Sequence, residues 1–166
     1  PSTAQDPECE MLRAALEGLA EDPVRVLATT NRRVPEEPIE VPDNAVLRDW
    51  LPYSQAMAAA DLVISHGGHG TVVRALSLGA PLLACPAVGD MGENGARVAW
   101  SGAGLSLPRR LMSPRAIRLA ARRILGDPTY RERAGAIQQW SKENDGAERA
   151  AELCERNQRG ASEAPV

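Results

Sequence analysis

The sequence predicts an α/β domain built on a parallel β-sheet with helices on both of its faces. Short apolar runs alternate with helix-length amphipathic stretches as far as Leu107. Parallel strands need such long connections, whereas antiparallel strands can be joined by tight turns, so the alternation favours βαβ units. The 166 residues suffice for one domain of this kind, and 43% apolar with 25% charged residues is ordinary for a globular protein.

The first elements are a helix and two strands. Leucines at helical spacing predict a helix over residues 8–20, and a β-branched run predicts a strand at 24–29. Prolines among glutamates make residues 31–44 a surface loop, because proline cannot donate to a central sheet ladder. A second short strand follows at 45–50.

The middle of the chain continues the alternation around a glycine-rich turn. An alanine-rich helix at 52–60 precedes a strand at 62–65, and a helix at 71–78 follows the turn and ends at Gly79. The remaining elements of this part are a strand, a loop, a helix and a strand, predicted at 82–85, 86–91, 94–100 and 104–107.

The C-terminal third is predicted to be helical. Ser113 and Asp127 each precede a proline, which is typical of a capped helix start, so helices are predicted over 115–125 and 129–142. A last helix is predicted at 147–156. We expect Trp100 and Trp140 to pack in the core, and the arginines of this region to form a solvated helix face, namely Arg109, Arg110, Arg115, Arg118, Arg122 and Arg123.

We expect one domain over residues 1–159 and a flexible tail at 160–166. The opening segment, Pro1-Ser-Thr-Ala-Gln-Asp-Pro7, has the character of a loop that follows a strand, because nothing apolar precedes it and a helix follows. The interpretation is a fragment that lacks the first strand of its domain.

Charge and cysteine content exclude several classes of protein. The net charge of −3 gives no overall attraction to nucleic acid. Cys9, Cys85 and Cys154 have no CxxC spacing, so neither a disulfide framework nor a cysteine zinc site is indicated. No apolar run is long enough for a transmembrane segment, and a cytoplasmic location is predicted, with which peripheral membrane contact is compatible.

The only two histidines, His66 and His69, stand in the run from Asp61 to Thr71, where a strand ends, glycines follow and a helix begins. Such a turn presents free backbone N–H groups and the positive end of a helix dipole, and its glycines let a ligand approach the main chain. An anion is the expected ligand, most simply a phosphate. A histidine pair binding metal is the alternative, but no third ligand at suitable spacing lies nearby.

An ordered set of motifs surrounds this turn. The motifs are Trp50-Leu-Pro52, His66-Gly-Gly-His-Gly-Thr71, Gly79-Ala-Pro81, Pro86-Ala-Val-Gly-Asp-Met91, Asn94 and Gly102-Ala-Gly104. Their order and spacing resemble the nucleotide-sugar signature of the UDP-glycosyltransferase superfamily. The resemblance is close over residues 45–108. It implies a GT-B enzyme of two Rossmann-like halves, of which this chain is the C-terminal, donor-binding half with a helical C-terminal tail.

The resemblance also implies roles for single residues. The diphosphate would be bound by His66, Gly68, His69, Gly70 and Thr71, and the base would stack on Trp50, which alternatively is a plain core residue. Asp90 would bind hydroxyls of the donor sugar or, alternatively, only cap the following helix. Thr3 or Ser2, in the opening loop, would reach the phosphates from the side.

Three positions depart from the family pattern. Tyr53 stands where plant members have glutamine, Arg74 replaces a glutamate that binds ribose hydroxyls, and Met91 replaces the glutamine that contacts the sugar. These changes affect the recognition of the base, the ribose and the sugar. Both UDP-sugars and dTDP-sugars therefore remain possible donors. Arg74 would add a positive charge near the diphosphate.

The function that follows is inverting, metal-independent transfer of a hexose from a nucleotide sugar to a hydroxyl of a small-molecule or lipid acceptor. The nucleotide sugar is a co-substrate, and no other cofactor is expected. The general base is expected in the N-terminal acceptor-binding half, so this chain holds no catalytic residue and is inactive alone. The alternatives are a non-catalytic nucleotide-binding module, a subunit of a split glycosyltransferase and a GT-B sugar-nucleotide epimerase.

Overall fold

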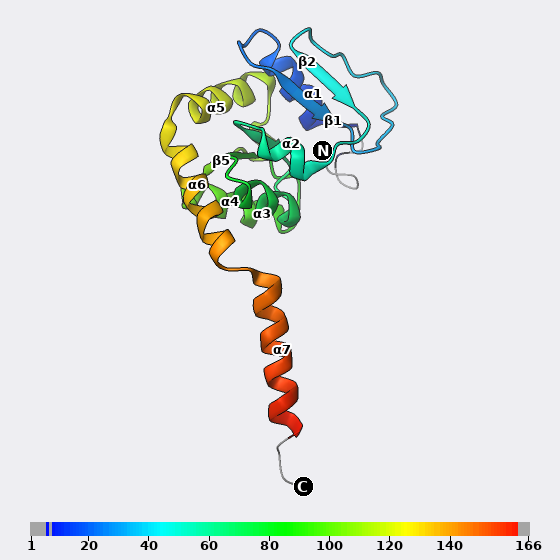
Figure 1. Ribbon diagram of the computed structural model, residues 1–166. Coiled ribbons are helices and arrows are strands. Elements are labelled where there is room, and N and C mark those ends of the chain that lie inside the picture. The colour runs from blue at the N-terminus through cyan, green and yellow to red at the C-terminus, as the bar shows by residue number, and fades with distance from the viewer. Residues whose placement is uncertain (1–5, 7, 163–166) are drawn as a thin grey trace.

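Five short parallel strands form the centre of the fold, in two sheets (Figure 1). The structure is a computed structural model that describes residues 6 and 8–162. Its smaller sheet pairs β1 (Val26–Thr29) with β2 (Ala45–Arg48). The larger has the order β3-β4-β5, made of Val63–Ser65, Leu82–Ala84 and Gly104–Ser106.

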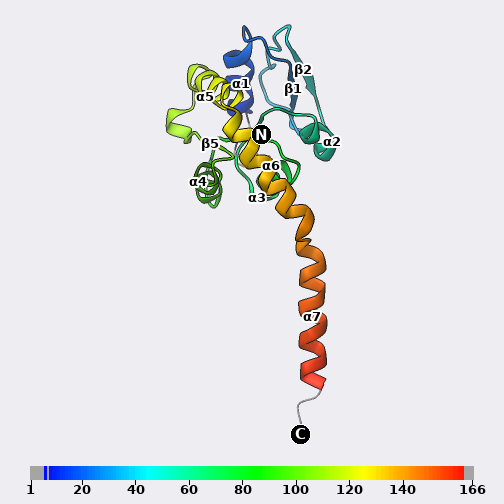
Figure 2. The same ribbon diagram turned by 60° about the vertical axis from the view of Figure 1, so that its left-hand side comes forward.

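Seven α-helices and one 3-10 helix are present in the described part of the chain. They are α1 (Glu10–Leu19), α2 (Tyr53–Ala58), α3 (His69–Ser77), α4 (Met91–Ser101), η1 (Arg109–Leu111), α5 (Pro114–Gly126), α6 (Pro128–Glu143) and α7 (Gly146–Ser162). Figures 1 and 2 both show α7 projecting away from the rest of the molecule. The predicted α/β class with parallel strands and a helical C-terminal part is confirmed.

The central strand β4 is buried on both faces. Leu82 and Ala84 pack in one cluster with Val72 of α3 and Val98 of α4. Leu83, whose side chain points to the opposite face, lies in a second cluster with residues of α1, α5 and α6, namely Met11, Ala15, Ile117, Ile124 and Tyr130. Helices therefore cover both faces of this sheet, as predicted.

Helix α1 packs against both sheets. Its residues Leu12 and Leu16 form a third cluster with Ala28 of β1, whereas Met11 and Ala15 face the cluster around Leu83. Residues four apart lie on one side of a helix, so these are two adjacent stripes along α1. A single helix thereby connects the cores of the two sheets.

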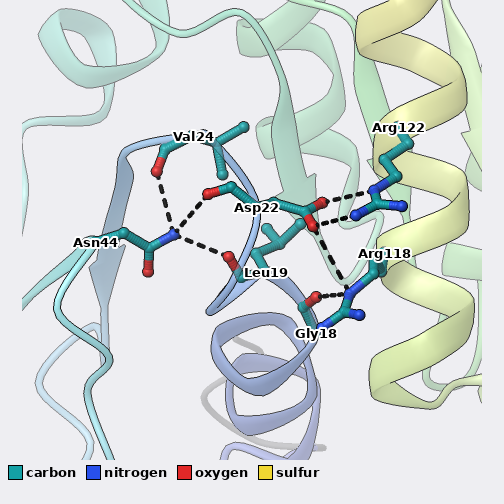
Figure 3. Close-up of polar contacts among 7 residues, drawn as sticks. All are labelled: Gly18, Leu19, Asp22, Val24, Asn44, Arg118 and Arg122. Carbon is teal, nitrogen blue, oxygen red and sulfur yellow. Dashed lines mark hydrogen bonds and ion pairs between the residues drawn. The ribbon is translucent and has the colours of Figure 1, made fainter.

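The turn between α1 and β1 is held from two sides by polar contacts (Figure 3). The Asp22 carboxylate, whose side chain is 3% exposed, accepts hydrogen bonds from Arg122 Nη2 at 2.8 Å and Nε at 3.1 Å. Arg118 Nε donates to the carbonyl of Gly18 at 2.6 Å. On the other side, Asn44 Nδ2 donates to three carbonyl oxygens of this turn, those of Leu19, Asp22 and Val24.

Arg118 and Arg122 correct the expectation of a purely solvated arginine face. Arg118 binds the carbonyl of Gly18 and lies 3.8 Å from Asp22, and Arg122 binds Asp22. These partners lie far away in the sequence, so no local pattern predicts the pairing. The predicted helix caps are confirmed: Ser113 Oγ accepts from Ala116 N at 3.2 Å, and Asp127 Oδ1 accepts from Thr129 N at 3.0 Å.

The prediction that Trp100 and Trp140 pack in the core is wrong. Their exposed fractions are 91% and 64%. On α4 the buried side is set by Val98 and by residues one and two turns before it, and Trp100 lies about 200° round the helix from Val98. No helix among the described residues combines the length and apolar character needed to cross a membrane.

We expect Asp22→Asn to lower the free energy of unfolding at pH 7. The hydrogen bond from Arg122 lowers the pKa of Asp22. Its stabilisation is therefore fully present above the unfolded-state pKa of about 3.9 and is lost as the pH falls through the folded-state pKa. Urea denaturation should show the difference between wild type and variant shrinking below about pH 4.

Asp61→Asn is the matched control, because Asp61 is 85% exposed in its ion pair with Arg131 and surface pairs contribute little. An Asp22→Asn effect no larger than that of the control would contradict the role of Asp22.

Candidate functional site

The glycine-rich turn follows the carboxyl end of β3 and leads directly into α3. Gly67 adopts a left-handed conformation with φ of 75°, and Gly68 is the residue that precedes the helix. The carbonyl of Gly68 accepts from the N–H groups of Thr71 and Val72, both at 3.0 Å. The N–H groups of His69 and Gly70 stand too early in the helix for an intrahelical acceptor, so they are available to an anion.

The His66 imidazole lies over the start of α3. A Cβ placed on Gly68 would come within 2.6 Å of His66 Nε2, so only glycine leaves room for the ring. His66 Nδ1 is buried and has no hydrogen-bond partner among the described residues. Burial lowers the pKa of His66, and the carboxylates of Asp6 and Asp90 act in the opposite direction. A neutral imidazole retains one N–H that can donate to an oxygen atom.

Asn94 of α4 holds the glycine-rich turn in place through its side-chain amide. Its Nδ2 donates to the carbonyl of Gly67 at 3.1 Å and to Asp90 Oδ2 at 3.2 Å, and the residue is 8% exposed. A Cβ on Gly67 would lie 3.3 Å from the carbonyl oxygen of Met91. The loop after β4 is thereby held against the loop after β3, which brings Asp90 next to the histidine turn.

Asp90 precedes α4, yet its side chain makes no capping hydrogen bond to the helix backbone. Its contact is with Asn94 Nδ2, and the residue is exposed. The alternative that Asp90 only caps α4 therefore has no hydrogen bond in its favour. Helix α4 begins at Met91 rather than at residue 94, and Met91 itself is 8% exposed.

Trp50 lies just beyond the end of β2 and is 50% exposed, which does not match the alternative of a plain core residue. The guanidinium carbon of Arg32 lies 5.7 Å from the centre of its ring. Tyr53 begins α2, and burial raises the pKa of its hydroxyl while the charge of Arg74 on α3 acts against this rise. Tyr53 packs against the cluster that contains Val72 and Ala75 of α3, the helix that carries Arg74.

The structure gathers most of the predicted site residues. His66, Gly68, His69, Gly70 and Thr71 share one turn, and Asp90 and Met91 lie beside it. Thr3 and Ser2 lie outside the described residues. In the part of the chain that the structure describes, no three His, Cys, Asp or Glu side chains come together as a metal site needs.

Sequence reasoning missed three contributors. Asn94 belongs to the quoted motif, but its bridge to Gly67 depends on the packing of α4. Asp6 accepts hydrogen bonds from the N–H groups of Glu10 and Met11 at the start of α1, at 2.7 and 3.3 Å, and its charge opposes the lowering of the His66 pKa by burial. Asp6 lies three residues before Cys9, the residue that precedes α1, so the usual capping pattern gave no signal for it. Arg32 gave no signal.

Comparison with known proteins assigns the family. Residues 13–156 match the profile described as the C-terminal domain of erythromycin biosynthesis protein CIII-like proteins. The chain belongs to this family. It corresponds to the donor-binding half of GT-B glycosyltransferases, and the resemblance to the UDP-glycosyltransferase superfamily is confirmed.

Similar proteins are longer than this EryCIII-like domain. It is 34% identical over 154 residues to 4'-demethylrebeccamycin synthase of Lentzea aerocolonigenes, covering 93% of this chain and 36% of the relative. It is 30% identical over 130 residues to UDP-glucosyltransferase avaP of Aspergillus versicolor, with 78% and 28% covered. The chain thus spans about a third of the length of these relatives.

A solved structure supports the same assignment. The glycosyltransferase VinC in complex with dTDP superposes with a TM-score of 0.74 at 28% identity, covering 89% of this chain and 38% of that chain. The parallel strands and helices of the EryCIII-like domain therefore correspond to one half of a GT-B enzyme.

We expect Gly68→Ala to displace the His66 ring, because its Cβ would meet Nε2 at 2.6 Å. Binding of dTDP or UDP, measured by isothermal titration calorimetry, should weaken by roughly tenfold or more, the loss of about one hydrogen bond to a charged group.

Gly135→Ala on α6 is the control, because a Cβ there meets nothing within 4 Å and alanine favours the helix. It should bind normally and unfold at the same or a higher temperature. Wild-type affinity in folded Gly68→Ala protein would rule out this placement of the His66 ring.

Proposed function

We propose that this chain is the donor-binding half of an inverting, metal-independent hexosyltransferase that uses a UDP-sugar or dTDP-sugar. The observation that carries the proposal is the His66 imidazole over Gly68 at the start of α3, beside free N–H groups. This arrangement combines a helix dipole, main-chain donors and one side-chain donor at a single point, and a diphosphate offers oxygen atoms to all of them.

In the proposed reaction, an acceptor hydroxyl oxygen forms a bond to the anomeric carbon while the bond from that carbon to the diphosphate oxygen breaks, and the hydroxyl proton passes to a general base of the N-terminal half. The nucleoside diphosphate leaves and gains negative charge as this bond lengthens. His66 Nε2, the N–H groups of His69 and Gly70, and the Thr71 hydroxyl would stabilise this charge more in the transition state than in the bound donor.

The nucleoside would lie toward Trp50. We propose that the base stacks on the half-exposed indole, and that Tyr53 and Arg74 line the path between the base and the phosphates. The names of two similar proteins support both nucleotides: VinC was solved with dTDP, and avaP is called a UDP-glucosyltransferase.

The donor sugar would lie toward the loop after β4. Asp90 is exposed and its Oδ2 is oriented by Asn94, so it can accept hydrogen bonds from sugar hydroxyls. The contact of Met91 with the sugar stays a prediction. Because Met91 is 8% exposed and packs against Gly67, its main contribution in this proposal is to hold the turn.

The acceptor and the general base would belong to an N-terminal half, since the chain spans about a third of its relatives. The domain itself would gain one parallel strand between β1 and β3. Neither strand pairs on its second edge within the described residues, and insertion there would give the order of a doubly wound sheet.

The nucleotide site is tested by a thermal-shift panel of dTDP, UDP, GDP and ADP. We expect dTDP or UDP to raise the unfolding temperature of the wild-type chain, and His66→Ala to abolish most of this shift. Losing a hydrogen bond to a charged group corresponds to roughly 10- to 100-fold weaker binding.

Arg97→Ala is the control, because Arg97 is exposed on α4 and pairs only with Glu93 in the described interactions. An unchanged shift in His66→Ala would remove His66 from the site, and no shift with any nucleotide would reject the proposed function.

The division of labour between two halves predicts that this chain binds nucleotide without catalysing transfer. Incubation with dTDP-glucose or UDP-glucose and a panel of hydroxylated acceptors should release no nucleoside diphosphate above the buffer rate. The reason is that the proposed general base is on the other half. Acceptor-dependent release that disappears in His66→Ala would contradict this division.

A further inference from the structure

The turn after β1 has an unusual backbone. Asn31 and Arg32 both adopt left-handed conformations, with φ of 54° and 64°, although neither is glycine. Two successive residues in this region are costly, and such a conformation persists only where the surroundings fix it. The side chain of Arg32 is exposed, so burial of that side chain does not explain the conformation.

Hydrogen bonds to the end of β2 fix this turn. The backbone N–H of Arg32 donates to the carbonyl oxygen of Asp49 at 2.6 Å. The Thr29 hydroxyl donates to the same oxygen at 3.1 Å and accepts from the N–H of Asn31 at 3.0 Å. Asp49 immediately precedes Trp50. The left-handed turn is thus tied to the backbone that carries the tryptophan.

The consequence is that Arg32 covers one face of the Trp50 indole, with its guanidinium carbon 5.7 Å from the ring centre. A cation over an aromatic face is attracted by the negative charge of that face, and a planar guanidinium can stack on it. Trp50 is still 50% exposed, which leaves ring surface for a second planar group.

We propose that Arg32 is a positioning residue for the nucleotide base: it holds the Trp50 indole from one face and presents the opposite face for stacking. This inference rests on the proposed function, because it assumes that a nucleoside diphosphate binds. A ring already fixed in orientation loses less freedom when the base stacks on it. The contribution of Arg32 is then confined to the base and does not extend to the diphosphate.

The experiment compares two ligands by isothermal titration calorimetry, the nucleoside diphosphate that binds best and inorganic pyrophosphate. Arg32→Ala should weaken nucleoside diphosphate binding about 2- to 5-fold, as a cation–π contact at an exposed site implies, and leave pyrophosphate binding unchanged. Arg32→Lys should fall between wild type and Arg32→Ala. In a Trp50→Ala background, Arg32→Ala should cause no further loss, because the two residues act through one contact.

Arg48→Ala is the matched control, an exposed arginine on β2 whose Nη1 donates to the carbonyl of Leu47. It should bind both ligands like wild type. Equal weakening of pyrophosphate and nucleotide by Arg32→Ala would indicate a merely structural role and overturn the inference. Unchanged nucleotide binding by Arg32→Ala would also overturn the inference. Tighter nucleotide binding by this variant would overturn it too, because it would mean that Arg32 shields the ring from the base. If wild type binds neither ligand, the proposed function itself has failed.

Discussion

The close approach of the His66 imidazole to Gly68, which leaves no room for a Cβ there, is the constraint on which the candidate site depends. It requires a strand that ends at Ser65, a left-handed glycine at position 67 and a helix that starts without a side chain beneath the ring. Asn94 adds the second half of the arrangement, because its amide bridges Gly67 and Asp90. One short turn thus joins the ends of two neighbouring strands to the starts of two helices.

The scaffold supports this turn by burying its central strand completely. Because β4 is covered on both faces, the loops that leave β3 and β4 start from fixed points. Helix α1 also packs against the smaller sheet, and the buried Asp22 carboxylate joins the end of α1 to α5. The Trp50 region and the His66 region are therefore parts of one packed body, linked by α1 and by Tyr53 of α2, which packs against the cluster that contains Val72 of α3.

Elements with strong local signals could be predicted from the sequence. The proline-led helix starts, the apolar strands and the glycine-rich turn all have local physical causes, and the structure has them at nearly the predicted positions. Helix α3 begins at His69, two residues before the predicted start at Thr71, because the backbone of His69 and Gly70 is already helical after Gly68. Helix α7 runs to Ser162, beyond the predicted end at Arg156.

Features that depend on distant packing could not be predicted. The burial of Asp22 against α5, the exposure of Trp100 and the bridge made by Asn94 all follow from which side of a helix meets its neighbour. The position of Arg32 over Trp50 depends on two left-handed residues whose identities, Asn and Arg, do not demand that conformation. Residue types defined the chemistry of the site, whereas tertiary contacts defined its geometry.

The projecting helix α7 carries a cysteine that differs chemically from the other two. Cys9 and Cys85 are buried, and burial raises the pKa of Cys85 to about 12, so neither thiol reacts readily with alkylating reagents. Cys154, on α7, is exposed. A maleimide dye would consequently attach at a single point, on the helix that projects away from the rest of the molecule, and would report on that helix.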